Sequence, residues 1–314
     1  MATCNGVSHL GEQIASIQAQ TYDDWVLLVS DDQSTDGTLE LLGELAESDT
    51  RIKLLQSSVD APRGAAANFS RLMQAGLQHG GNLFFFCDQD DVWEQHKLER
   101  QVSEFPQQGG ERTPLLVHSD LSVVDSDLAQ IHPSLIGYMA LEPSPSRPLH
   151  YLLTRNFVTG CASACNRSLL ETAVPVSSQA IMHDWWLALV AAATGEITYI
   201  ASPLVKYRQH GGNSIGAKGF WHGLNPTNNW VSGWRAGNEE FLATFCQVRA
   251  LYSHALEAGN CWPDDNVVLL QDYSCLLDST SVSRLALAHR MGLRQGNKLL
   301  QAIYYLRLLT VQDK

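Results

Sequence analysis

The fold is decided by Phe84-Phe85-Phe86-Cys87-Asp88-Gln89-Asp90-Asp91-Val92-Trp93, an apolar run that ends abruptly in three carboxylates. Acids crowded at the end of a buried strand repel one another and are costly to desolvate unless a cation shares their charge. Mg²⁺ and Mn²⁺ suit this setting, because they bind one or two carboxylates together with water and substrate phosphates. The segment therefore predicts a divalent-cation site, with a solvated acidic loop as the alternative.

Helix-like and strand-like patterns alternate through the first 130 residues. Apolar side chains recur at helical spacing in 10–17, 38–46, 69–77 and 98–105, and strand-like apolar runs occupy 25–29, 51–56, 83–87 and 115–124. Strands that alternate with helices of this length predict an α/β fold with a mostly parallel sheet covered by helices on both faces. In open α/β sheets ligands bind at the carboxyl ends of the strands, which is where the three acids stand.

The rest of the chain follows a different pattern. A Pro-rich linker at 142–148 precedes a strand-like run at 158–164, a helical pattern at 184–193 and a strand-like run at 197–200. From about residue 221 only helical periodicity remains, and a segment rich in Gly, Asn and Trp, 211–234, separates the two patterns. The sequence therefore predicts an α/β domain over residues 1–216 and a helical C-terminal region over 217–314.

Composition excludes some classes of function. The chain has 33 acidic against 21 basic residues and a net charge of −12, which argues against nucleic-acid binding driven by phosphate contacts. Its seven cysteines are scattered without zinc-ligand spacing, as expected of reduced thiols in a cytosolic protein. Without a signal peptide or a run of about 18 apolar residues, we expect a soluble cytoplasmic protein. Little strand precedes Thr3, so either the first strand is short or residues are missing upstream.

Five further segments join the acidic one at the predicted sheet edge or beside it. Together with it they resemble glycosyltransferase family 2, the inverting GT-A enzymes, and within that family its rhamnosyltransferase-like members. The match extends over about residues 1–216 in the family's order, with a truncated first strand and with Cys4 where an aromatic residue is common. The segments that carry it are Ala2-Thr3-Cys4-Asn5-Gly6, Gln18-Ala19-Gln20-Thr21-Tyr22, Ser30-Asp31-Asp32-Gln33-Ser34-Thr35-Asp36-Gly37-Thr38, Asp88-Gln89-Asp90-Asp91-Val92-Trp93, His183-Asp184-Trp185-Trp186 and Tyr207-Arg208-Gln209-His210.

The resemblance implies a nucleotide and metal site. Asp32 matches the carboxylate that reads the nucleobase, and Thr3 lies beside the same pocket. Asp88 matches the acid near the ribose and the metal, Asp90 matches the ligand of a Mg²⁺ or Mn²⁺ ion, and His210 resembles a residue that joins the metal or the diphosphate. The alternatives are a turn cap for Asp31 or Asp32 and a solvated loop position for His210.

Three further positions have weaker matches. Arg208 is expected to contact the diphosphate, with a surface ion pair as the alternative. Asp91 is expected at a helix N-terminus or behind the ligands rather than as a ligand. The pair Arg63-Gly64 precedes a predicted helix N-terminus and is expected near the nucleotide.

Asp184 matches the family's general base. Inversion requires a carboxylate that takes a proton from the acceptor hydroxyl as this hydroxyl attacks the anomeric carbon opposite the leaving diphosphate. The alternative is that Asp184 only caps its helix. Of the next two residues, Trp185 and Trp186, at least one is expected in the core and the other could contact a sugar ring.

The sequence thus predicts a metal-dependent glycosyltransferase of the hexosyltransferase type. The resemblance favours rhamnose from a dTDP donor, a cell-surface or lipid-linked glycan as the acceptor, and a cytoplasmic location at the inner face of the membrane. Basic positions within 284–308 suggest peripheral membrane contact through C-terminal helices, or else helices packed on the domain. Two other functions remain open: a Mg²⁺-dependent phosphohydrolase, for which Asp264-Asp265 is an unconvincing second acid pair, and a non-catalytic module that binds nucleotide sugars.

Overall fold

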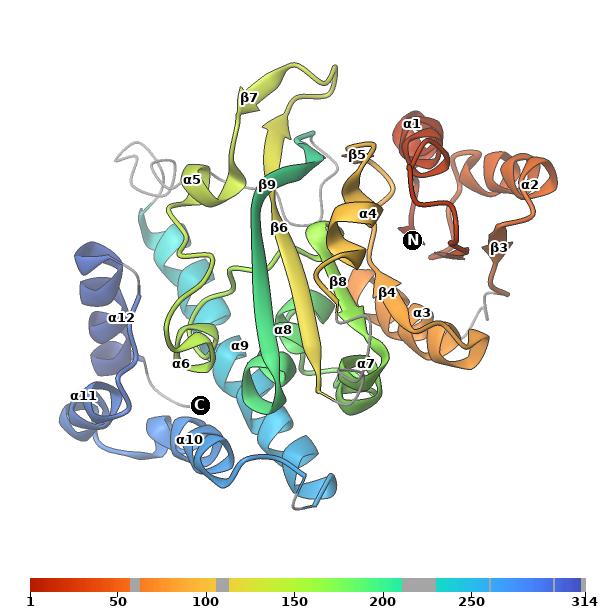
Figure 1. The fold of residues 1–314 in the computed structure, drawn as a ribbon. Helices are drawn as coiled ribbons and strands as arrows, with labels where there is room; N and C mark the ends of the chain where they lie inside the picture. Colours follow the sequence, from red (N-terminus) through yellow and green to blue (C-terminus); the bar gives the residue numbers. More distant parts are fainter. Residues whose placement is uncertain (57–62, 106–112, 211–229, 260, 296, 312–314) are drawn as a thin grey trace.

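The computed structural model describes residues 1–56, 63–105, 113–210, 230–259, 261–295 and 297–311 (Figure 1). Its N-terminal part is a small parallel sheet in the order β1-β2-β3, flanked by helices. Apolar residues on one face of each helix turn inward, such as Leu10 and Ile14, which are fully buried. The elements of this part are β1 (Ala2–Thr3), α1 (Val7–Gln18), β2 (Leu27–Asp31), α2 (Thr38–Ser48), β3 (Ile52–Leu54) and α3 (Ala65–His79).

A second, larger sheet forms the centre of the molecule in the order β4-β8-β6-β9-β5, with β7 paired to β6. Only β6 and β9 run parallel in this sheet, so the pairing is mixed where the sequence predicted a mostly parallel sheet. The backbone N–H of Ala2 donates to the carbonyl of Cys87 at 3.4 Å and joins the two sheets. The strands are β4 (Leu83–Phe85), β5 (Val92–Trp93), β6 (Leu115–Val124), β7 (Gln130–His132), β8 (Ser163–Asn166) and β9 (Glu196–Arg208).

Several predicted elements have different bounds. The strand expected at 158–164 begins as a 3-10 turn, Gly160–Ala162, and only then becomes β8. The short strand expected at 197–200 is the start of the 13-residue strand β9. The helices of this region are α4 (Lys97–Val102), α5 (Leu135–Met139), α6 (Pro148–Leu152), α7 (Arg167–Ala173) and α8 (His183–Thr194).

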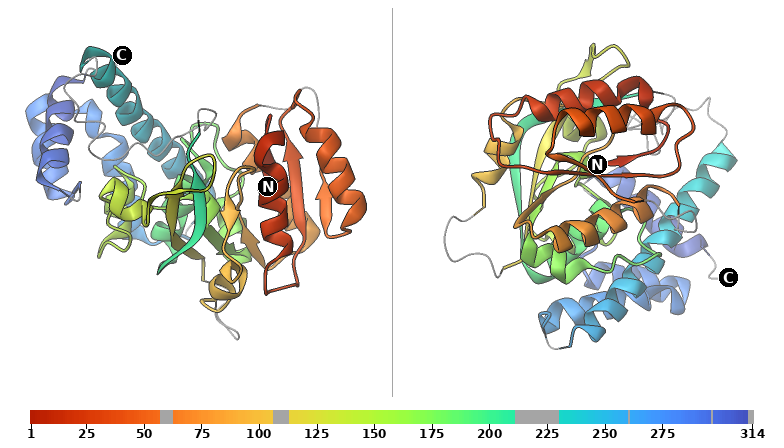
Figure 2. Two further views of the ribbon diagram at one scale, coloured as in Figure 1. Left: turned by 90° about the horizontal axis from the view of Figure 1, so that it is seen from above. Right: turned by 90° about the vertical axis from the view of Figure 1, so that its right-hand side faces the viewer.

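The C-terminal part is helical, as predicted, and lies at the opposite end of the molecule from the N-terminal sheet (Figure 2). It consists of α9 (Trp230–Glu257), α10 (Asp264–Ser274), α11 (Ser281–Arg290) and α12 (Lys298–Thr310). Phe245 and Leu251 of α9 belong to the same buried cluster as Trp186 of α8. The predicted domain boundary at 216/217 lies outside the described residues, and the two predicted regions share one hydrophobic core.

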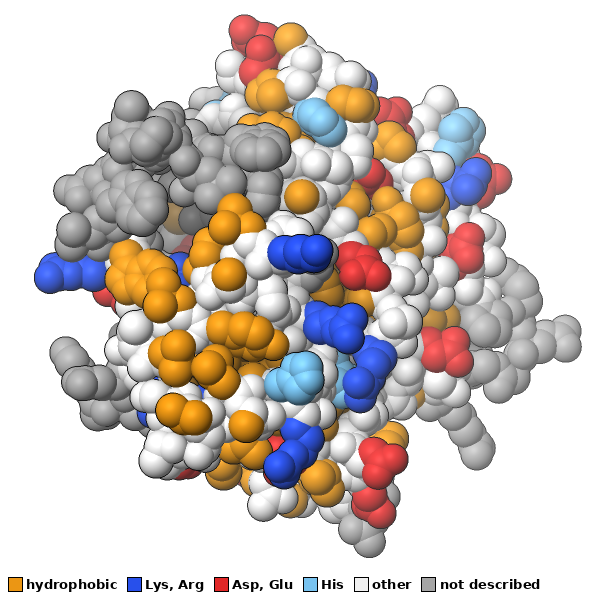
Figure 3. Space-filling model, turned by 90° about the vertical axis from the view of Figure 1, so that its left-hand side faces the viewer, with side chains coloured by type: hydrophobic (Ala, Val, Ile, Leu, Met, Phe, Trp, Pro, Cys, Tyr) orange, Lys and Arg blue, Asp and Glu red, His pale blue; other side chains and the backbone are white. Residues whose placement is uncertain are grey.

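The basic residues of the last two helices have different environments. Arg284 is buried, and its guanidinium donates to the carbonyls of Leu277, Leu308 and Val311, so it fastens α11 to α12. Arg290, by contrast, is exposed. Figure 3 shows the face where these helices lie, with apolar side chains beside Lys and Arg. Within the described ranges, no helix combines the length and the apolar character needed to cross a bilayer.

Candidate functional site

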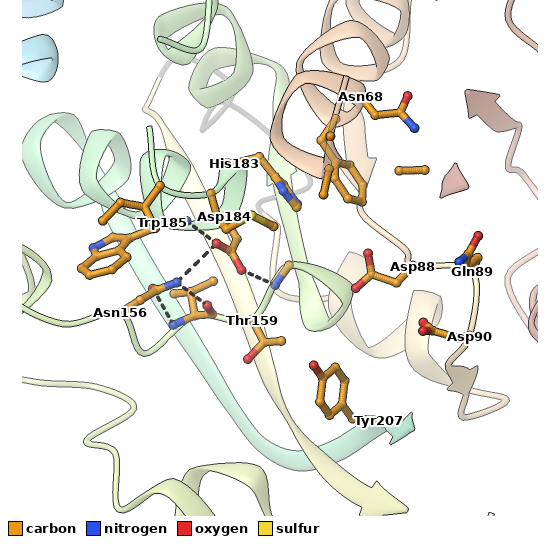
Figure 4. Close-up of a pocket in the computed structure, with 18 of the residues that line it drawn as sticks. Asn68, Asp88, Gln89, Asp90, Asn156, Thr159, His183, Asp184, Trp185 and Tyr207 are labelled. Atoms are coloured by element: carbon orange, nitrogen blue, oxygen red, sulfur yellow. Dashed lines mark hydrogen bonds between the residues drawn. The ribbon is translucent and has the colours of Figure 1, made fainter. Parts of the chain in front are cut away.

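A cavity of about 800 Å³ opens where the ends of several strands meet. Its walls include the end of β1, the start of α3, the loop after β4, the segment 154–160, the start of α8 and the end of β9 (Figure 4). Glu240 of α9 also lines it, so the C-terminal region contributes to the cavity. All the predicted site residues except Arg208 line it, namely Thr3, Asp32, Asp88, Asp90, Asp184 and His210.

The two acids after β2 take different roles. Asp31 accepts hydrogen bonds from the Thr3 hydroxyl at 2.8 Å and from the Ser34 backbone N–H and hydroxyl, so it is the turn cap that one alternative proposed. Asp32 lies on the cavity, and its Oδ2 accepts the backbone N–H of Gly64 at 2.7 Å. Asp32 and Gly64 therefore bring two loops together at the end of the cavity where the nucleotide was predicted.

Gln89, the residue between the two acids of the Asp-x-Asp pair, holds the loop after β1. Its side-chain oxygen accepts the Cys4 backbone N–H at 2.8 Å, and its amide donates to the Cys4 carbonyl at 2.9 Å. Gly6 allows this approach, because a Cβ at that position would lie 2.2 Å from the Gln89 oxygen. The acidic loop and the N-terminal loop are thus fixed to each other.

The three acids after β4 face different surroundings. Burial, together with the nearby charges of Asp90 and Asp184, raises the pKa of Asp88 to about 7. Asp90 is held by His210, whose Nε2 lies 2.8 Å from Oδ2. Asp91 is fully buried and does not begin a helix. Its Oδ1 accepts the backbone N–H of Arg208 at 3.1 Å, and burial raises its pKa well above the usual value.

These residues fit a divalent cation. Asp88 and Asp90 line the same cavity, and the repulsion between them is part of what raises the pKa of Asp88. A cation there would offset that repulsion, and two carboxylates with one imidazole are ligands that Mn²⁺ or Mg²⁺ accepts. Asp88 also belongs to a deeper group with Asp91 and Cys161, whose potential ligand atoms lie within 4.8 Å of one another.

The position of Arg208 differs from the predicted one. Its side chain is 1 % exposed and does not line the cavity. The guanidinium donates to the backbone carbonyl of Asp90 at 2.7 Å, to the carbonyl of Ser126 and to the carboxylate of Glu12 at 2.5 Å. Arg208 is therefore a buried anchor of the acidic loop rather than a diphosphate ligand.

Asp184 lies in the first turn of α8, with its carboxylate toward the cavity (Figure 4). The helix cap is Met182, so the cap alternative for Asp184 is wrong. The carboxylate accepts the backbone N–H groups of Gly160 at 2.9 Å and Trp185 at 2.6 Å, and the Asn156 amide at 3.3 Å. Burial nevertheless raises the pKa of Asp184 to about 6, so the group is ionised at neutral pH and is a stronger base than a solvated aspartate.

Both tryptophans after Asp184 are buried, which confirms the expectation of at least one core residue. Trp186 is fully buried and donates to the Ala173 carbonyl, whereas Trp185 donates to Leu152 and also lines the cavity. The sequence patterns single out neither Asn156 nor Gly160: Gly160 lies within the run 158–164, which predicts a strand, and Asn156 lies outside every motif. The turn of the backbone at 156–160 brings the Asn156 amide and the Gly160 N–H to the carboxylate of Asp184.

Comparison with known proteins gives a consistent result. The model of the family described as Glycosyl transferase family 2 matches residues 1–171. The dTDP-rhamnosyl transferase RfbG of Shigella flexneri is 28 % identical over 225 residues, which cover 69 % of this chain and 74 % of that protein. The UDP-Glc:alpha-D-GlcNAc-diphosphoundecaprenol beta-1,3-glucosyltransferase WfgD of Escherichia coli is 39 % identical over 103 residues, which cover 33 % of this chain and 38 % of that protein.

Among solved structures, TarS 1-349 of S. aureus in complex with UDP-GlcNAc is similar over 98 % of this chain and 88 % of its own. The TM-score is 0.50 and the identity is 13 %. At that identity the likeness concerns the fold alone. It confirms the predicted α/β fold of the GT-A type, with a helical region after it.

Proposed function

The chain belongs to glycosyl transferase family 2, and we propose that its cavity moves a sugar from a nucleoside diphosphate donor to an acceptor hydroxyl with inversion. One observation carries this proposal: the half-buried carboxylate of Asp184 faces the same cavity as Asp88 and Asp90. A base and a diphosphate site on one cavity are the two parts that an inverting transfer needs. Family membership also removes the phosphohydrolase alternative.

In this mechanism Asp184 accepts the proton of the attacking hydroxyl. The Gly160 and Trp185 N–H groups hold its oxygens in place, so little reorientation is needed when the proton arrives. A pKa of about 6 keeps the group ionised at pH 7 and makes it a better proton acceptor than a solvated aspartate.

At the other end of the cavity, Asp32 and the loop beside Thr3 would bind the nucleoside. Asp90, Asp88 and His210 would hold the Mg²⁺ or Mn²⁺ ion, which when bound neutralises charge on the leaving diphosphate. Arg208 acts indirectly, since it holds the backbone at Asp90 from behind.

Two relatives support a particular donor sugar and a particular acceptor. A dTDP-rhamnose donor is supported by the printed activity of RfbG, and a lipid-linked glycan acceptor by that of WfgD. An acceptor of this kind would place the protein at the cytoplasmic face of a membrane.

A thermal-shift screen tests the proposed function. The full chain is heated with UDP, GDP, dTDP and their sugars, with and without Mn²⁺ or Mg²⁺. A native-state ligand raises the apparent stability by about 2.7 kcal/mol at 100 times its Kd. We expect one nucleotide series to raise the melting temperature in a metal-dependent way, and Asp90→Ala to lose the metal-dependent part. If a folded sample responds to none of them, the proposal is wrong.

The alternative of a non-catalytic module is tested in the same preparation. Once the donor is known, release of the nucleoside diphosphate with an acceptor glycan measures turnover. Tight donor binding without any turnover by the wild-type chain would favour the module.

Membrane contact would use the outer face of the last two helices (Figure 3). The last two helices and the turn between them carry exposed basic and apolar side chains in an otherwise acidic protein, namely Arg290, Arg294, Lys298, Val282, Leu299, Leu306 and Leu309. We expect the chain to sediment with vesicles that contain anionic lipid, and charge reversal at the three basic residues to abolish this. Reversal at Lys53, Arg63 and Arg100, which are also exposed but lie in the N-terminal part of the chain, is the matched control with the same change in charge. Equal loss in both variants would contradict a localised contact.

A further inference from the structure

His183, the first residue of α8, is buried in an unusual way. Its side chain is 2 % exposed, yet neither ring nitrogen has a hydrogen-bond partner among the residues that the structure describes. The ring stacks on Phe69 with 3.7 Å between centroids and lies 5.4 Å from Phe86. Buried polar groups are nearly always hydrogen-bonded, and an unpaired one costs about 1–3 kcal/mol. The imidazole therefore lacks a partner that something outside the chain can supply.

The unpaired ring lies at the cavity. His183 is one of the residues that line it, between Asp184 on one side and Asp88 on the other (Figure 4). Gly160 leaves room for the ring, because a Cβ there would lie 2.7 Å from Nε2. The ring thus borders the space between the proposed base and the proposed diphosphate site. In an inverting transfer, that space holds the sugar that moves.

The chemical state of the ring suits a hydroxyl. Burial lowers the pKa of His183 to about 3, so the ring is neutral at physiological pH. A neutral imidazole has one N–H donor and one nitrogen acceptor. A sugar hydroxyl both donates and accepts, and can pair with either nitrogen, whereas a phosphate oxygen could only accept.

We infer that His183 binds a hydroxyl of the donor sugar and helps to select that sugar. The inference rests on the proposed function, since Asp88 and Asp184 mark the two ends of the sugar only if they have the roles given above. It also explains why a neutral histidine, rather than a lysine or arginine, borders the carboxylates of this cavity. A cation there would form an ion pair with Asp184 and weaken it as a base.

The test separates sugar binding from nucleotide binding. His183→Phe keeps a ring that can stack on Phe69 and removes both nitrogens. For the donor found in the screen, affinity for the nucleotide sugar and for the bare nucleoside diphosphate is measured by calorimetry, and kcat/KM by nucleotide release. We expect kcat/KM to fall roughly 10- to 100-fold, while affinity for the nucleoside diphosphate stays within about twofold. His183→Gln, whose amide also donates and accepts, should recover part of the loss.

A matched control is His118→Phe. His118 is 1 % exposed and has an unpaired Nδ1, but it does not line the cavity. The same substitution there should leave donor discrimination unchanged. With the wild-type chain, a donor that lacks the contacted hydroxyl should have a kcat/KM lower by the same factor that His183→Phe costs with the intact donor. With the His183→Phe variant, removing this hydroxyl should lower kcat/KM little further.

Two results would overturn the inference alone: a folded His183→Phe protein with kcat/KM within about threefold of the wild type, or one that loses nucleoside diphosphate affinity in parallel. If this variant does not fold, the same comparison is made with His183→Leu against His118→Leu, which removes both nitrogens as well, and equal donor kinetics in the two would overturn the inference. A wild-type chain that binds no nucleotide sugar would overturn the proposed function as well.

Discussion

Replacing Asp184 by asparagine should separate its chemical role from its structural one. The substitution keeps the shape of the side chain and removes the basic oxygen. Loss of a positioned general base lowers rates by about 10²- to 10⁴-fold, so we expect transfer to fall by that factor. Donor affinity should change little, because the nucleotide and metal residues are elsewhere in the cavity.

The structure also predicts an effect on stability. The pKa of Asp184 is about 6 in the folded protein, against an unperturbed value of 3.8. The folded state therefore binds this proton more tightly, and the corresponding stabilisation is complete below pH 3.8 and is lost as the pH rises through 6. The difference corresponds to about 3 kcal/mol, at 1.36 kcal/mol for each pH unit.

Asparagine does not titrate, so the stability of the variant does not fall in this way as the pH rises through 6. It can no longer accept from both the Gly160 and the Trp185 N–H groups, which costs about 1–3 kcal/mol at every pH. The free energy of unfolding of the variant should therefore be lower than that of the wild type at pH 4. Between pH 4 and pH 8 this difference should shift by about 3 kcal/mol in favour of the variant.

Urea unfolding of both proteins across this pH range measures the difference. Other titrating groups largely cancel in it, apart from Asp88, whose pKa is raised in part by the charge of Asp184. In parallel, kcat/KM of the wild type for the acceptor, measured with saturating metal and donor so that Asp88 is already ionised, should rise about tenfold per pH unit below pH 6 and level off above it. Two results would refute the reasoning: a stability difference that does not depend on pH, or transfer at wild-type rates by the asparagine variant.

Three further substitutions test neighbouring parts of the argument. Gly160→Ala should reduce kcat more than tenfold with little change in nucleoside diphosphate affinity, since its Cβ would lie 2.7 Å from Nε2 of His183; unchanged kinetics would show that the ring yields freely. Gln89→Ala should weaken nucleoside diphosphate binding about tenfold in calorimetry, because the Cys4 loop loses both its hydrogen bonds to Gln89, and equal affinity would count against this. Arg284→Met should lower the free energy of unfolding, measured in urea, by about 2–4 kcal/mol, since buried carbonyls lose their donor. Its kcat/KM should stay near the wild-type value. A variant that is as stable as the wild type but inactive would show that Arg284 serves catalysis rather than stability.

Local patterns predicted much of this fold. The alternation of periods gave the α/β class and the helical C-terminal region, and the apolar run 115–124 has the same bounds as β6. Pairing direction was harder, because it depends on contacts between distant segments. β8 pairs antiparallel with both β4 and β6, and nothing in the residues of a strand states which way its neighbour runs.

The candidate site shows the same division. Residues named for their chemical type, such as Asp88 and Asp184, lie on one cavity because strand ends converge there. Arg208 was placed wrongly, since a basic residue near a predicted phosphate site suggests a ligand, whereas a buried arginine is recognised only by its partners. Gln89 was missed for a similar reason: its amide pairs with the backbone of a residue 85 positions away.

The cavity also has an energetic logic. Asp88, Asp91 and Asp184 all have a raised pKa, with burial as the main cause in each case. Each ionised form is therefore unfavourable in the empty protein, and the stability of the fold must come from elsewhere, chiefly from the core that α8 and α9 share. A cation and a donor would relieve part of this cost, whereas the acceptor proton would neutralise Asp184 itself. Stabilisation by ligands should therefore be large at pH 8, where these groups tend to be ionised, and smaller at pH 5, where protons already relieve the same strain.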